Sequence, residues 1–92
     1  MNKMTDRELL EAAGYWCAEF NCPDRVPLNW NPLKNDGDAL RLAVMLRLDV
    51  DCEHDPIAVG RDEIGVREPW GVDPYAATRR AIVRAAAALT EA

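Results

Sequence analysis

The chain contains no serine and only one histidine, His54. The missing serine excludes a catalytic triad of serine, histidine and aspartate. A cysteine nucleophile paired with His54 is compatible with the composition, but the spacing of the three cysteines does not indicate one. The five glycines match neither a phosphate-binding loop nor a dinucleotide-binding fingerprint. These absences favour a protein that is not an enzyme and that needs no cofactor.

Long apolar runs are also missing. No uninterrupted run is longer than that from Ala85 to Leu89, whereas a membrane-spanning helix needs about 20 residues. The start of the chain lacks the apolar segment of a signal peptide, and an odd number of cysteines does not suggest a disulfide framework. From these features we expect a cytoplasmic protein that does not bind membranes.

Positive charge is in the minority. Sixteen acidic and eleven basic residues give a net charge of −5, which disfavours direct binding to nucleic acid. The length of 92 residues allows one domain, residues 1–92, and the hydrophobic content of 49% is enough for a core. Proteins, cations or basic surfaces are therefore the expected partners.

Two helices are predicted in the first half of the chain. Thr5 and Glu8 fit a capping box, so a helix should begin there and end between Gly14 and Phe20. The proline-rich segment 21–35 favours an extended connection or a short edge strand.

The second predicted helix follows candidate N-caps at residues 35–38 and covers residues 39–48, which contain no helix breaker. Its apolar residues form two faces. One face consists of Ala39, Leu42, Ala43 and Leu46, and the other consists of Leu40, Val44 and Leu48. Either the first helix covers the second face or another molecule does, and we predict a homodimer.

The second half should form strands and a third helix. Residues 49–55 alternate acidic and other residues, which predicts a strand with Val50 and Cys52 inside. Residues 57–59 and 64–66 predict two further strands around a turn, and Asp73-Pro74 predicts a helix that runs towards Thr90. Its apolar stripe consists of Tyr75, Thr78, Ile82, Ala85, Ala86 and Leu89. The fold class is therefore α+β, with three helices and a short antiparallel sheet of about three strands.

Four carboxylates form the first candidate site. On a regular strand, alternate residues lie about 6.6 Å apart on one face. Such a row is either a solvated strand face or an imitation of a phosphate backbone. The acidic face consists of Asp49, Asp51, Glu53 and Asp55.

A zinc site is the second candidate. Cys17, Cys22, Cys52 and His54 have the composition of a Cys₃His set. The single residue between Cys52 and His54 is not the usual spacing for such a site, so we expect no bound metal.

Arginines and aromatic residues form the third candidate site. By helical geometry Arg79 borders the apolar stripe, whereas Arg80 points away from it into solvent. Arg79 either extends its stem along the core or contacts a phosphate or carboxylate beside Trp70 and Tyr75. Trp30 and Trp70 are either structural anchors or ligand platforms. All five are candidate residues for binding a ligand or partner.

Two stretches resemble a known family. Residues 30–44, which include Trp30-Asn31-Pro32-Leu33, and residues 73–86, which begin with Asp73-Pro74-Tyr75, are similar to the phage ABA sandwich domain of small bacteriophage proteins. The resemblance implies an α/β/α sandwich in the cytoplasm of a bacterial host, and it carries no catalytic motif.

Together these features lead us to expect a small phage accessory protein that binds a host component, such as a defence or regulatory factor. One alternative is a module that sequesters a small phosphorylated molecule near Arg79 and Arg80. A weaker alternative is a small hydrolase that uses Cys52 or His54.

Overall fold

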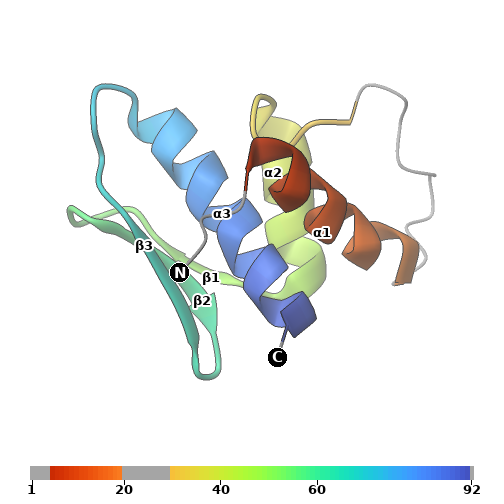
Figure 1. Ribbon diagram of the computed structural model, residues 1–92. Helices are drawn as coiled ribbons and strands as arrows, with labels where there is room; N and C mark the ends of the chain where they lie inside the picture. The colour runs from red at the N-terminus through yellow and green to blue at the C-terminus, as the bar shows by residue number, and fades with distance from the viewer. Residues whose placement is uncertain (1–4, 20–29, 92) are drawn as a thin grey trace.

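The structure is a computed structural model that describes residues 5–19 and 30–91, with the backbone alone for residues 13–19 and 90–91. The order of elements is α1 (Asp6–Glu19), α2 (Asp36–Leu46), β1 (Asp49–Asp51), β2 (Ile57–Arg61), β3 (Ile64–Glu68) and α3 (Pro74–Glu91) (Figure 1). In this part of the chain the strands form one antiparallel sheet in the order β1-β2-β3. The predicted α+β class, with three helices and three strands, is confirmed.

Side chains close in sequence determine where each helix begins. The Thr5 amide donates to Glu8 Oε1 at 2.8 Å, and the Glu8 amide donates to Thr5 Oγ1 at 3.2 Å. Asn35 accepts a hydrogen bond from the Asp38 amide, and Asp73 accepts from the amides of Tyr75 and Ala76. These are N-caps, which satisfy amides that have no partner within a helix.

The second helix begins and ends earlier than predicted, because it starts at Asp36 and stops at Leu46 rather than reaching Leu48. Arg47 adopts a left-handed conformation with φ of 56°, and the Leu48 amide donates to the Ala43 carbonyl at 2.9 Å. Together with the bond from the Arg47 amide to the Val44 carbonyl, this is a Schellman motif. The motif turns the chain directly into β1.

Segment 21–35 is described only from residue 30 onward. Residues 32–34 form a turn that Asn31 closes by accepting hydrogen bonds from the amides of Lys34 and Asn35. The edge strand that we considered there does not occur among the described residues of the segment.

The predicted strand over residues 49–55 is wrong in its length and in the burial of its apolar face. It ends at Asp51, where the side chain accepts a hydrogen bond from the Glu53 amide at 3.1 Å and starts a turn. Val50 and Cys52 are exposed instead of buried. The reason is position, since α3 packs on β2 and β3 and does not extend over β1 at the opposite edge of the sheet.

The hairpin of β2 and β3 contains a close approach that only glycine permits. Gly60 pairs with Gly65, and a Cβ atom on Gly60 would lie 2.1 Å from the Ile64 carbonyl oxygen. Asp62 in the turn has φ of 54°.

α3 lies at the centre of the molecule. It packs on the sheet with one side and on α1 and α2 with the other, so the described helices all share one face of the sheet (Figure 1). For this reason Ala81, Val83 and Ala87 are buried in addition to the predicted stripe. Tyr75, predicted to belong to that stripe, is exposed because it borders an open groove. Among the described helices, none combines the length and the hydropathy of a membrane span.

Candidate functional site

An apolar groove of about 570 Å³ opens between α2, the β1 edge and the first turns of α3. Its walls include Leu40, Val50, Cys52, Trp70, Tyr75 and Arg79. Three of the five residues predicted to bind a ligand or partner, Trp70, Tyr75 and Arg79, therefore meet at one place. The acidic segment adds Val50 and Cys52, which the sequence analysis had placed in the core.

The large apolar side chains around this groove are uncovered. The exposed fraction is 63% for Leu40 and 72% for Tyr75, and it is 39% for Val50 and 36% for Trp70. On α2 the exposed row continues to Val44, at 67%. The alternative to a homodimer, cover of Leu40, Val44 and Leu48 by the first helix, does not hold for Leu40 and Val44, whereas Leu48 is half-buried against the core. A contiguous apolar patch of this kind marks an interaction site more often than single exposed residues do.

Hydrogen bonds hold Trp70 in the groove wall. Its indole Nε1 donates to the His54 carbonyl at 2.8 Å, and its backbone amide donates to Asp55 Oδ1 at 3.1 Å. These two bonds join the β3–α3 connection to the loop between β1 and β2. One wall of the groove is thus fixed before any partner arrives, which reduces the entropy lost on binding.

The arginines of α3 have partners within the chain. Arg79 donates from Nε to the Leu33 carbonyl at 2.9 Å and forms a 2.6 Å ion pair with Asp36. Arg80, predicted to be solvated, instead pairs with Asp6 at 2.7 Å and ties α3 to α1. Both guanidinium groups therefore hold elements of this chain together.

Trp30 lies apart from the groove. It is half-buried and packs against the hydrophobic core, so it acts as the structural anchor that was one of its two predicted roles.

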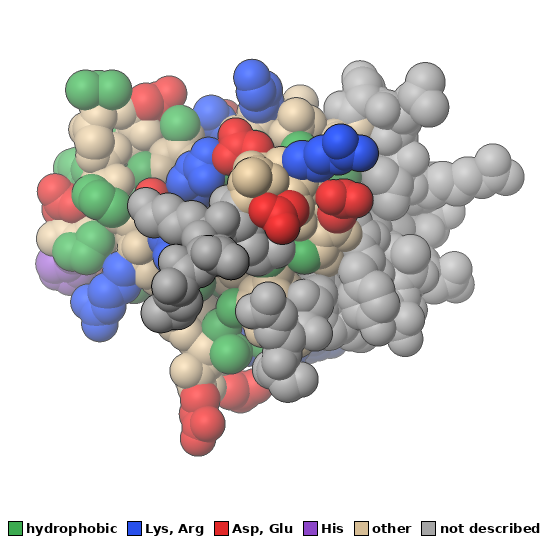
Figure 2. All heavy atoms as spheres, in the orientation of Figure 1, with side chains coloured by type: hydrophobic (Ala, Val, Ile, Leu, Met, Phe, Trp, Pro, Cys, Tyr) green, Lys and Arg blue, Asp and Glu red, His purple; other side chains and the backbone are tan. Residues whose placement is uncertain are grey.

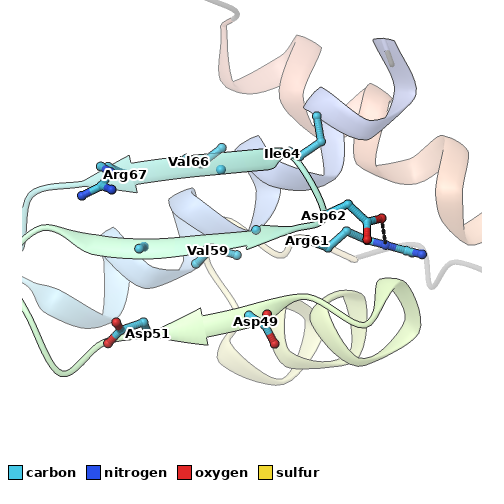
Figure 3. A pocket seen from close by; sticks show the side chains of 11 residues that line it. Asp49, Asp51, Val59, Arg61, Asp62, Ile64, Val66 and Arg67 are labelled. Carbon is cyan, nitrogen blue, oxygen red and sulfur yellow. Dashed lines mark hydrogen bonds and ion pairs between the residues drawn. The ribbon is translucent and has the colours of Figure 1, made fainter.

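The predicted row of four carboxylates does not exist as a row. Asp49 and Asp51 project from β1 towards the face of the sheet away from the helices (Figure 3). Glu53 and Asp55 follow in the loop, where Asp55 is bonded to Trp70. The regular spacing of a phosphate backbone requires a strand that continues to residue 55, and β1 stops at Asp51.

A shallow hollow of about 280 Å³ covers that outer face of the sheet. Asp49 and Asp51 line it together with Arg61 and Arg67 from the other two strands (Figure 3). The Arg61 guanidinium donates hydrogen bonds to the Asp62 carboxylate and to the Leu46 carbonyl. Mixed charge and an open shape give this hollow no preference for an anion.

The sequence analysis missed one cluster of possible metal ligands. Ligand atoms of Asp51, Glu53 and His54 lie within 4.8 Å of one another, and all three side chains are exposed. The sequence analysis grouped His54 with cysteines, of which Cys52 is exposed and the side chains of Cys17 and Cys22 lie outside the described part. The Asp51 carboxylate already accepts a hydrogen bond from the Glu53 amide, and its Oδ1 lies 3.7 Å from His54 Nδ1. Exposed acidic groups of this kind are common without a metal ion.

Comparisons with models of protein families, with curated proteins and with solved structures give no match to this chain. The resemblance to the phage ABA sandwich domain stays a prediction.

Proposed function

We propose that this chain is a non-enzymatic protein-binding module that docks a partner protein in the groove beside α2. The observation that carries the proposal is the contiguous exposed surface of Leu40, Val44, Val50 and Tyr75, next to a tryptophan held by two hydrogen bonds. Aromatic and aliphatic side chains around a preformed pocket are the usual centre of a protein interface. The phage resemblance makes the partner a bacterial host protein, such as a defence or regulatory factor.

The two other predicted functions have less support. A phosphorylated ligand would need free cationic groups, but Arg79 and Arg80 are each paired with a carboxylate. A hydrolase would need a base beside Cys52, and within the described residues His54 contacts Asp51 while no hydrogen bond joins it to Cys52. The predicted homodimer would form through α2 and would use the same apolar surface.

Affinity capture from bacterial lysate tests the proposal with a matched pair of variants. Leu40→Ser removes an apolar side chain from the groove, whereas Val72→Ser removes a fully exposed one that does not line it. We expect the tagged wild type and Val72→Ser to retain one stoichiometric protein that Leu40→Ser loses, with unchanged circular dichroism for all three. Equal capture by Leu40→Ser, or no captured protein at all, would contradict the proposal.

A further inference from the structure

The two segments that build one side of the groove carry charge of a single sign. Residues 48–60 and 69–78 contain no lysine or arginine. These segments carry five exposed carboxylates: Asp49, Asp51, Glu53, Asp55 and Asp73. Asp49 and Asp51 face the outer side of the sheet, whereas Asp55 accepts a hydrogen bond from the Trp70 amide and Asp73 accepts one from the Tyr75 amide, so Asp55 and Asp73 adjoin the groove. At the edge of the molecule where the histidine lies, Figure 2 shows hydrophobic and acidic side chains side by side, with a Lys or Arg side chain below the histidine.

On the opposite side, along α2, opposite charges are paired. Asp36 pairs with Arg79 across the groove, and Asp38 pairs with Arg41 on the helix surface at 3.2 Å. These pairs leave little net charge beside Leu40. In the described part of the chain, the unpaired charge beside the groove therefore comes from Asp55 and Asp73, next to Trp70 and Tyr75, and it is negative.

A second copy of this chain fits such a surface poorly. In a dimer with two-fold symmetry the same patch faces itself. The acidic segments would then meet acidic segments, with no lysine or arginine in either to compensate. Like charges brought together at an interface oppose association.

We infer that the occupant of the groove is an amphipathic segment of a different protein, with apolar side chains flanked by lysine or arginine. Apolar side chains of the segment fill the space between Leu40, Val50 and Tyr75, while its cationic groups meet the surrounding carboxylates. Charge complementarity of this kind speeds association and selects the partner. The inference rests on the proposed function and gives the partner its chemistry.

A random dodecapeptide library displayed on yeast provides the probe. We expect the wild-type protein to enrich peptides that combine lysine or arginine with aliphatic or aromatic residues, and to deplete acidic ones. One enriched peptide, labelled with a fluorophore, then reports its Kd by anisotropy. Leu40→Ser should weaken this Kd by about tenfold or more.

Two double variants with the same change in formal charge test the role of the carboxylates. Asp55→Asn with Asp73→Asn lies beside the groove, and each asparagine keeps the Oδ1 atom that accepts from the Trp70 or the Tyr75 amide. Asp62→Asn with Glu63→Gln lies in the β2–β3 turn. We expect the first to weaken binding by about fivefold at about 0.1 M salt and much less at about 1 M, because salt screens exposed charges. The second should leave the Kd unchanged.

The outcomes separate this inference from the proposed function. Enriched peptides without a cationic bias, or equal Kd values for both double variants, overturn the charge inference and leave the groove as a docking site. Peptides that bind Leu40→Ser as tightly as the wild type overturn both. A library that yields no binder overturns the inference, and a dimer in sedimentation that Leu40→Ser dissociates then identifies a second copy as the occupant.

Discussion

The hydrogen bonds between Thr5 and Glu8 lower the pKa of the Glu8 carboxyl. The Thr5 backbone amide, which donates to Glu8 Oε1, lowers the pKa of the Glu8 carboxyl, and the Thr5 side chain adds to this effect. A lowered pKa in the folded state means that the ionised carboxylate stabilises the fold. The capping interaction is therefore fully present above the ordinary pKa of glutamate, about 4.3.

We predict that the start of α1 loses stability as the pH falls through the lowered pKa of Glu8. An NMR titration of the Glu8 carboxyl carbon should give a midpoint below that of an unfolded peptide. Glu8→Gln is the matched control, because glutamine also occupies this position of a capping box but does not titrate. A loss of α1 helicity in Glu8→Gln over the same pH range would contradict this assignment.

Interactions between residues near one another in sequence could be predicted, and interactions between distant residues could not. The caps at Thr5, Asn35 and Asp73 act over two or three residues, so their pattern is visible in the sequence. The partner of Arg79 is Asp36, which lies 43 residues away. Helical geometry placed Arg79 at the border of the core but could not tell which group it would meet.

At the scale of single elements, α2 ends where the sequence has no residue typical of a helix end. Arg47 occupies the left-handed position of the Schellman motif, where glycine is the usual residue. A side chain there costs energy because Cβ crowds the backbone, which glycine avoids. The sequence therefore gave no reason to end the helix before Leu48.

We predict that Arg47→Gly raises the free energy of unfolding by up to about 1 kcal/mol, since the relief of backbone crowding exceeds the greater entropy of glycine in the unfolded chain. Urea unfolding followed by circular dichroism measures the change. Arg47→Ala removes the same side chain but keeps a Cβ, so it should give no such gain. Equal stabilisation by both variants would attribute the effect to lost charge instead.

The strands show a similar division between pattern and context. Alternation predicted β2 and β3 correctly. It succeeded because Ile57, Val59 and Val66 face α3 and are buried. The same alternation in residues 49–55 was misleading. Periodicity indicates which residues share a face but not whether an element covers that face, and α3 covers β2 and β3 but not β1.

For the whole molecule, α2 separates core from groove within two residues. Leu42 is almost completely buried, with an exposed fraction of 1%, whereas Leu40 is 63% exposed. We predict that Leu42→Ala lowers the free energy of unfolding by about 2 to 5 kcal/mol, while Leu40→Ala changes it by about 0.5 kcal/mol or less. Thermal unfolding of both variants provides the measurement. Similar losses would mean that Leu40 is covered in solution.

The sequence predicted both apolar faces of α2 and left open what covers the second. Coverage depends on how elements far apart in the chain are arranged, and short-range periodicity carries no information about that. The groove itself joins Leu40 to Trp70 and Tyr75, which lie at least 30 residues further along the chain.

The central position of α3 has a consequence for folding during synthesis. α1, α2 and the sheet all pack against α3, yet all of them leave the ribosome before it does. Until residues 81–87 emerge, Leu42, Leu46, Ile57 and Val59 lack the apolar surface that α3 contributes to the core. The nascent chain therefore remains without the part of its core that α3 supplies until translation has passed α3, and only then can the preceding segments complete their packing.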